Sequence, residues 1–152
     1  MKTSLFVDRS TETQSVALVR DGAVVAERTL DGLDSRSGGW VAEVRDFVAG
    51  ARLDEIVVGT GPGSFAGIRA ALSFAQGYAI GAGCGVRGLP SVCALAPETG
   101  PLAVVGDARR GMMWVALFDG RSLVGGIRQT GAETLARLVQ IGKHTSELQS
   151  RI

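Results

Sequence analysis

The opening of the chain consists of short apolar runs that polar or glycine-containing turns separate. Ser4–Val7 is the first run, and it ends in Asp8-Arg9-Ser10-Thr11, which is predicted to be a polar turn. Ser15–Arg20 and Ala23–Leu30 follow, joined by Asp21-Gly22, which is typical of a two-residue hairpin turn. Apolar runs of this length between turn residues predict β-strands. We therefore expect a three-stranded meander at the start of the chain.

At Trp40 the period of the apolar positions changes. Trp40, Val44, Phe47 and Ala51 recur at helical spacing, with charged residues between them. This spacing predicts an amphipathic helix that ends at Ala51. A short strand is expected next, at Ile56–Gly59.

A glycine-rich loop, Gly59–Gly67, connects that strand to a predicted helix at Ile68–Ala82. A strand that enters a helix through glycines directs backbone N–H groups and the positive end of the helix dipole at one place, which suits an anion. The loop lacks the Lys-Ser or Lys-Thr pair of a P-loop, and it also departs from the dinucleotide fingerprint and the nucleophile elbow. The equally weighted alternative is that the glycines only allow a turn and close helix packing. The candidate anion-binding residues are Gly61, Gly63 and Ser64.

The middle of the chain links two similar halves. Val86–Leu89 is predicted as a fifth strand, and Ser91 as the N-cap of a short helix over Val92–Ala96 that Pro97 ends.

The second half repeats the opening pattern. Leu102–Val105 leads to Asp107, and Met112–Phe118 follows a basic glycine turn. Asp119-Gly120 then turns the chain into Ser122–Ile127. Strand, Asp, polar turn, strand, Asp-Gly and strand thus occur twice, which predicts two related lobes.

The repeat also defines the expected domains. Residues 1–100 are predicted as a first lobe and residues 101–140 as an incomplete second lobe, whose first helix is Ala132–Val139. A second lobe built like the first would carry a further strand and helix, so we expect a truncation. Residues 141–152 resemble the translation of a sequencing adapter and are expected to be a non-native tail, with a flexible natural terminus as the alternative.

The composition of the chain excludes several classes of function. With 45% hydrophobic and 20% charged residues, the chain can bury a core, and its net charge of +1 gives no broad field for nucleic acid. Any RNA contact must therefore be local or made by a partner. The single histidine, His144, excludes a histidine-based triad and a His-rich metal site. The sequence shows neither a signal-peptide pattern nor an apolar run of membrane length, so we expect a cytoplasmic protein without a membrane partner.

The strand-end aspartates Asp8 and Asp107 are further candidates. In an actin-like ATPase, an acidic residue at the end of the first strand of each lobe organises a hydrated Mg²⁺ under the nucleotide phosphates. Arg109 and Arg110 could hold phosphate in such a site. The favoured alternative is ordinary turn chemistry for the aspartates and solvated arginines.

Two long motifs carry a resemblance to a known family. Gly61–Arg69, with Leu72–Gly77 after it, and Asp107–Gly111, with Trp114–Phe118 after it, strongly resemble the TsaB family. These proteins are bacterial subunits of the tRNA threonylcarbamoyladenosine machinery. The resemblance extends from the N-terminus to about Val139. It implies an α/β, actin-like ATPase (ribonuclease H-like) fold, with a mixed sheet and flanking helices and with the second lobe truncated.

The resemblance further implies a noncatalytic subunit. TsaB-like proteins pair with the catalytic subunit TsaD, which transfers threonylcarbamoyl to N6 of adenosine 37 in tRNAs that read codons beginning with A. The ATPase TsaE joins them, and ATP or ADP belongs to the assembled complex, with no cofactor held by TsaB alone. tRNA would be met indirectly, and a homodimer is left open. Arg9 and Ala66 stand where the family usually has threonine, which weakens intrinsic nucleotide binding.

The predicted partner surface lies on the two helices. The Ile68–Ala82 helix carries more apolar surface than one contact needs, so one face can lie on the sheet and another would suit a partner helix. The alternative, which is the commoner outcome for a single sequence, is a helix enclosed within its own lobe. A nucleotide-dependent kinase or carbamoyltransferase of the actin-like fold is the alternative, and a peptidase is not expected. The expected partner-binding residues are Trp40, Val44, Phe47, Ile68, Ala71, Leu72, Phe74, Ala75, Gly77 and Tyr78. The expected cofactor-binding residues are Asp8, Gly61, Gly63, Ser64, Asp107 and Arg109.

Overall fold

The computed structural model describes residues 1–30 and 39–141, and side chains as far as residue 136. The chain divides into two compact units, Met1–Ser91 and Val92–Ile152. The predicted lobe boundary at residue 100 stays a prediction. The predicted tail, apart from its first residue, lies outside the described residues.

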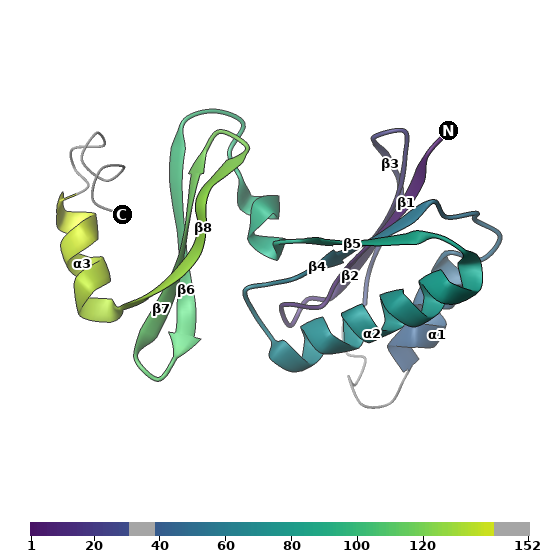
Figure 1. Ribbon diagram of the computed structural model, residues 1–152, viewed down its shortest axis with the longest axis horizontal. Coiled ribbons are helices and arrows are strands. Elements are labelled where there is room, and N and C mark those ends of the chain that lie inside the picture. Colours follow the sequence, from purple (N-terminus) through teal and green to yellow (C-terminus); the bar gives the residue numbers. More distant parts are fainter. Residues whose placement is uncertain (31–38, 142–152) are drawn as a thin grey trace. The chain divides into compact units, whose positions relative to one another are not determined.

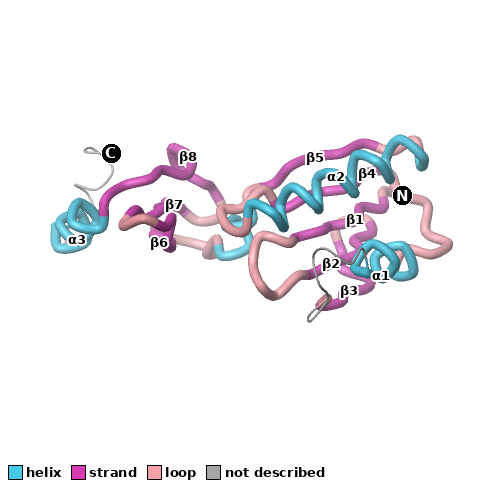
Figure 2. The backbone as a smooth tube through the Cα atoms, turned by 90° about the horizontal axis from the view of Figure 1, so that it is seen from below, coloured by secondary structure: helices cyan, strands magenta, loops and turns pink. Residues whose placement is uncertain are grey.

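Unit 1 contains a five-stranded mixed sheet. Its strands lie in the order β3-β2-β1-β4-β5, with β1–β2 and β2–β3 antiparallel and β1–β4 and β4–β5 parallel (Figure 2). The predicted meander is therefore confirmed. The strands are β1 (Thr3–Asp8), β2 (Ser15–Arg20), β3 (Ala23–Thr29), β4 (Glu55–Gly59) and β5 (Gly85–Leu89).

Two helices cover one face of this sheet, α1 (Gly39–Phe47) and α2 (Phe65–Ala82) (Figures 1 and 2). Alternate residues of β1, such as Leu5 and Val7, point toward the helices and are at most 1% exposed. Ile56 and Val58 of β4 join them. The core of unit 1 therefore lies between the helices and one side of the sheet.

Both helix boundaries differ from the prediction. α1 ends at Phe47 and not at Ala51, because the chain tightens into turns in which Ala49 N–H donates to Asp46. Gly50 then adopts a φ of +79°, which no right-handed helix accommodates. α2 begins at Phe65, three residues earlier than predicted, because the N-cap precedes it within the glycine loop.

Unit 2 contains a three-stranded antiparallel sheet. A short helix precedes the sheet in the sequence, and another follows it. Its strand order is β6-β7-β8. Ala116 and Phe118 of β7 form a small core with Val92. The indole of Trp114 lies where a side chain at Gly106, its cross-strand partner, would stand. The elements are η1 (Ser91–Leu95), β6 (Pro101–Arg109), β7 (Met112–Asp119), β8 (Ser122–Gly131) and α3 (Ala132–Ile141).

The strands of unit 2 are longer than predicted. β6 continues through Asp107 to Arg109, and β8 continues past Ile127 to Gly131, because cross-strand pairing extends to the hairpin turn between Arg109 and Met112. The predicted helix after Ser91 is a 3₁₀ helix. Among the described residues, no helix combines the length and apolar character needed to cross a membrane.

Candidate functional site

The glycine loop between β4 and α2 uses several of its amides within the protein. Ser64 Oγ accepts a hydrogen bond from Gly67 N–H at 3.2 Å, and Ser64 N–H donates to the Ser10 carbonyl at 2.6 Å. Gly61 N–H donates to Ser91 Oγ at 3.0 Å. Ser91, predicted as an N-cap, therefore ties the glycine loop to the end of β5. These bonds satisfy donors that an anion would otherwise meet.

Close packing explains three of the glycines. A Cβ at Gly67 or at Gly63 would collide with the carbonyl oxygens of Arg9 and Ser10, respectively, in the β1–β2 connection. A Cβ at Gly59 would collide with the Asp8 carboxylate. The glycines thus allow α2 and its loop to approach the end of β1. This observation favours the structural reading of the loop, while anion binding at Gly61, Gly63 and Ser64 stays a prediction.

The two strand-end aspartates make the same local hydrogen bond. Asp8 Oδ1 accepts the N–H of Ser10 at 2.7 Å, and Asp107 Oδ1 accepts the N–H of Arg109 at 2.6 Å. In both cases the side chain of residue i accepts the backbone N–H of residue i+2, which is the hydrogen bond of an Asx turn. The repeat seen in the sequence is therefore present in the geometry. Asp8 lies in unit 1 and Asp107 and Arg109 lie in unit 2, and their predicted joint nucleotide site stays a prediction.

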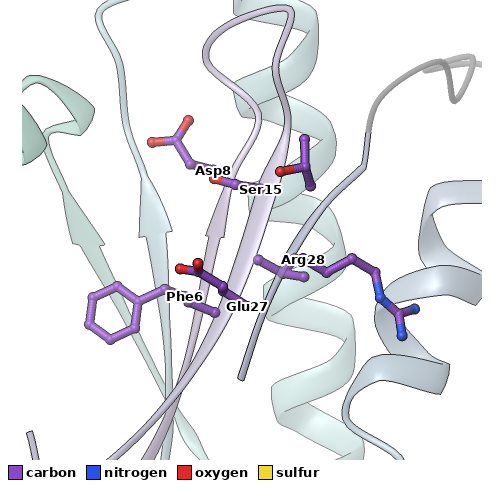
Figure 3. A pocket seen from close by; sticks show the side chains of 8 residues that line it. Phe6, Asp8, Ser15, Glu27 and Arg28 are labelled. Atoms are coloured by element: carbon purple, nitrogen blue, oxygen red, sulfur yellow. The ribbon is translucent and has the colours of Figure 1, made fainter. Parts of the chain in front are cut away.

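A cavity of about 390 Å³ lies on the sheet of unit 1. Figure 3 shows the side chains of Phe6, Asp8 and Glu27 on one side of the strands, and that of Arg28 on the other. Arg28 pairs with Glu43 of α1 at 3.1 Å, so Phe6, Asp8 and Glu27 are on the face without helices. The cavity therefore offers two carboxylates and a phenyl ring, which does not suit a phosphate. Its lining is Phe6, Asp8, Ser15, Val16, Ala17, Glu27, Arg28 and Thr29.

Arg9 is buried, contrary to its prediction as part of a polar turn. The residue is 1% exposed, and its guanidinium carbon lies 4.1 Å from the centroid of the Trp40 ring. Its Nε donates to Gln14 Oε1, and its two terminal nitrogens have no hydrogen-bond partner within the described part of the chain. Burial lowers the pKa of the Arg9 guanidinium from its ordinary value. The ring face of Trp40 compensates part of this burial through a cation–π contact.

Four of the predicted partner-binding residues belong to the core, which corrects the prediction. Trp40 is 3% exposed and Val44, Ala71 and Ala75 are 0% exposed. Trp40 also packs edge-on against Phe74, with ring centroids 5.2 Å apart. These four side chains pack between the helices and the sheet, because the small residues of α2 let its axis approach β4. They cannot contact a second protein in the folded state.

The remaining predicted partner residues lie at or near the surface. Gly77 is exposed, and Ile68 is half-buried. The side chains that pack partly against the core are Phe47, Leu72, Phe74 and Tyr78. The sequence analysis missed the two most exposed large apolar side chains of α2, Phe65 at 73% and Ile80 at 86%. The signal was available for Ile80, which follows Gly77 by three residues and so shares its helix face.

Metal binding has no support in the described ranges 1–30 and 39–141, where no group of three or more His, Cys, Asp or Glu side chains could hold an ion. Asp8 and Glu27 are the acidic residues at the cavity of unit 1. Cys84 and Cys93 are free cysteines. Burial raises the pKa of the Cys84 thiol, which disfavours the reactive thiolate.

Comparison with known proteins places this fold and these motifs in a family. A family model described as "TsaD: tRNA N6-adenosine threonylcarbamoyltransferase" matches residues 47–141. The chain belongs to the TsaD family. Within the family it is TsaB-like: the tRNA threonylcarbamoyladenosine biosynthesis protein TsaB of Bacillus subtilis is 29% identical over 126 residues, which are 77% of this chain and 55% of that protein.

Other relatives agree. An uncharacterized protein of Mycobacterium tuberculosis is 34% identical over 134 residues, which are 82% of this chain and 64% of that protein. The chain therefore spans 64% of the length of this mycobacterial relative. Among solved structures, YeaZ from Pseudomonas aeruginosa superposes with a TM-score of 0.73 at 27% identity, covering 88% of this chain and 68% of that chain.

The fold predicted from the family resemblance is confirmed. The TsaB-like chain is an α/β protein with a mixed sheet and flanking helices. The fold is the actin-like ATPase fold that its structural neighbours share. One of these is the ethanolamine utilization protein EutJ from Carboxydothermus hydrogenoformans, with a TM-score of 0.50 at 17% identity, which covers 99% of this chain and 61% of that chain.

Proposed function

We propose that this chain is a noncatalytic subunit of the machinery that adds threonylcarbamoyl to N6 of adenosine 37 in tRNAs that read codons beginning with A. It acts by pairing with a TsaD-like catalytic subunit. Membership of the TsaD family and similarity to the Bacillus subtilis TsaB support the process. A TsaE-like ATPase joins the pair, and ATP or ADP is bound in the assembled complex.

The outward face of α2 is the observation that carries the proposal. On this face Phe65 and Ile80 are 73% and 86% exposed, and Gly77 lies between them with open space where a side chain would stand. The opposite face packs against the sheet through Ala71 and Ala75. Gly77 and Ile80 lie within one helical turn of each other, and an exposed apolar side chain beside a small residue suits close packing against a helix of a partner.

The noncatalytic assignment rests on the chemistry of the side chains. The only histidine of the sequence is His144, outside the described residues, and a TsaD-like metal site needs histidine ligands. The carboxylates of the strand-end aspartates bind the amides of their own turns. Neither feature favours group transfer by this chain.

Co-expression with a TsaD-like protein tests the proposal. The wild-type chain should co-elute with that subunit, and Gly77→Glu should abolish co-elution, because a carboxylate on the outward face would be buried in the interface. Space is open at Gly77, so the variant should fold. Val25→Glu is the matched control: it adds the same charge at a 48% exposed residue of β3, the sheet edge farthest from β4 and β5, along which α2 packs.

Two results would contradict the proposal. Co-elution that survives both Gly77→Glu and Ile80→Glu would exclude α2 as the interface. Tight binding of ATP with Mg²⁺ by the isolated chain, measured by calorimetry and lost in Asp8→Ala, would favour a nucleotide-dependent kinase or carbamoyltransferase instead.

A further inference from the structure

The turn between β6 and β7 has an unusual backbone for its residues. Arg109 closes β6 and pairs with Met112, so Arg110 and Gly111 form a two-residue hairpin turn. Arg109, Arg110 and Gly111 have φ angles of 67°, 54° and 75°. Positive φ at both turn residues is the type I′ geometry, for which Asn-Gly is preferred and arginine is not. A left-handed backbone conformation is unfavourable for a residue with a Cβ and a long side chain, such as arginine.

The other two hairpin turns within residues 1–30 and 39–141 have glycine or aspartate at the positions with positive φ. In the β2–β3 turn, Asp21 and Gly22 carry the positive φ angles, and in the β7–β8 turn Gly120 carries it. Within the described residues, Asp21, Arg109 and Arg110 are the non-glycine residues with positive φ. The β6–β7 hairpin therefore stands out because two consecutive arginines, one closing β6 and one in the turn, take a left-handed conformation that asparagine or glycine adopts more readily.

Both arginines are exposed and their guanidinium groups are unpaired. In the part of the chain that the structure describes, no hydrogen bond or ion pair of either guanidinium is found, and both residues are exposed. Asp107, the nearest carboxylate along the chain, accepts the backbone N–H of Arg109 at 2.6 Å, which fixes the turn. Glu133 belongs to the first turn of α3, which begins at the same end of the sheet. The backbone of the β6–β7 turn is therefore held by Asp107, while the side chains of Arg109 and Arg110 face solvent.

We infer that Arg109 and Arg110 contact the phosphate backbone of an RNA directly. Two guanidinium groups carried by a hairpin whose backbone is held suit bidentate contact with phosphate oxygens. A net charge of +1 leaves RNA binding to such local contacts. Protection of the exposed edge strand β6 would need charge but no left-handed arginine. Unfavourable backbone geometry held at an exposed site points to a role in binding.

This inference rests on the proposed function for the choice of RNA, and of tRNA in particular, as the ligand that carries the phosphates. Fluorescence anisotropy with a labelled, unmodified tRNA transcript measures binding to the chain alone and to its complex with a TsaD-like subunit, at several KCl concentrations. The test variant is the double substitution Arg109→Asn and Arg110→Asn. It leaves Asn-Gly in the type I′ turn, so its Tm should equal or exceed that of the wild type.

The double variant should bind tRNA about tenfold more weakly at low salt. Affinity decreases with salt, and the slope of log affinity against log salt concentration should become shallower by roughly 1.4 to 1.8, the contribution of two phosphate contacts. Arg121→Asn is the matched control, because Arg121 is an exposed turn arginine at the other end of the sheet and pairs with Glu98 at 3.2 Å. Its affinity and salt slope should be those of the wild type.

Three results would overturn the inference: no tRNA binding by the wild-type chain or complex, unchanged binding by the double variant, or an equal loss in Arg121→Asn. Loss of ATP binding with unchanged tRNA binding would also overturn it, because the phosphate would then belong to a nucleotide. Co-elution with the TsaD-like subunit is scored separately. The chain could bind tRNA through Arg109 and Arg110 and yet not co-elute with the TsaD-like subunit. In that case the proposed function is wrong, while the inferred RNA contact is supported.

Discussion

The covered and the open sides of unit 1 are built from the same elements but follow different rules. On the covered side, α1 and α2 pack on the sheet with small and branched side chains, among them Ala71 and Ala75 at 0% exposure. On the outward side of α2, Phe65, Gly77 and Ile80 are exposed, and the Arg69 guanidinium lies over the Phe65 ring. On the sheet face without helices, Glu55 binds Ser4, Lys2 and Arg87. The covered side holds the apolar core, polar contacts hold the other sheet face, and the outward side of α2 is available for binding.

This difference teaches that apolar character does not tell which side of a helix faces a partner. α2 is apolar around most of its circumference and has small residues on both sides, with Gly67, Ala71, Ala75 and Ala79 buried and Gly77 exposed. The larger apolar residues at its two ends remain exposed. Substitutions on the two sides should therefore have opposite consequences.

The largest effect is expected from Ala71→Glu on the covered side. A carboxylate at a fully buried position without a partner should destabilise unit 1 by more than about 3 kcal/mol and abolish cooperative unfolding. Thermal unfolding followed by circular dichroism measures this. If the variant folds with unchanged Tm, the assignment of this face to the core is wrong.

Gly67→Ala should have the next largest effect. The added methyl would meet the backbone carbonyl oxygen of Arg9, which cannot move aside as a side chain end can. A loss of about 1–3 kcal/mol is expected from overpacking at this contact. Urea unfolding gives the value, and Gly81→Ala is the control, because an added Cβ there meets open space.

On the bare sheet face, Glu55→Gln should change the pH dependence of stability. Burial would raise the pKa of Glu55, but hydrogen bonds from Ser4, Lys2 and Arg87 outweigh it and lower the pKa. Because the folded pKa lies below the unfolded one, the stabilisation is present above the unfolded pKa and is lost as pH falls through the folded pKa. Near pH 6, the free energy of unfolding of the wild type should exceed that of Glu55→Gln by about 1 kcal/mol or less. The difference should shrink between about pH 5 and pH 3. A constant difference across that range would contradict the assignment.

The smallest effect, and one of opposite sign, is expected from Gly77→Ala on the open side of α2. Alanine favours a helix interior over glycine by about 0.5–1 kcal/mol, and the site has room for the methyl group. Unfolding should therefore shift to higher urea, while co-elution with a TsaD-like subunit weakens if the helices pack closely there. A destabilised variant would show that this face is less open than described.

Much of the fold could be predicted because it depends on local patterns. The alternation of Leu5 and Val7, the Asp21-Gly22 turn and the glycine loop each specify a strand, a hairpin or a helix start within a few residues. The repeated aspartates Asp8 and Asp107 likewise gave both Asx turns. These features need no distant partner, so sequence neighbours suffice to determine them.

The candidate sites were less predictable, because burial depends on residues far apart in the chain. Arg9 reads as part of a polar turn, yet Trp40 and Gly67 from two other elements enclose it. Ser91 reads as a helix cap, yet its hydroxyl accepts the N–H of Gly61. No pattern within a helical turn or a strand carries either contact.

The sequence by itself determined the order and type of the elements, the turn chemistry and the family motifs, because hydrophobic period and backbone preference are properties of neighbouring residues. Only the tertiary structure decided that Trp40, Val44, Ala71 and Ala75 are core, and that Ile80 and the Arg109-Arg110 turn face solvent. Which side of an apolar helix is buried depends on the shape of the surface it meets. That surface exists only after strands distant in the chain have paired.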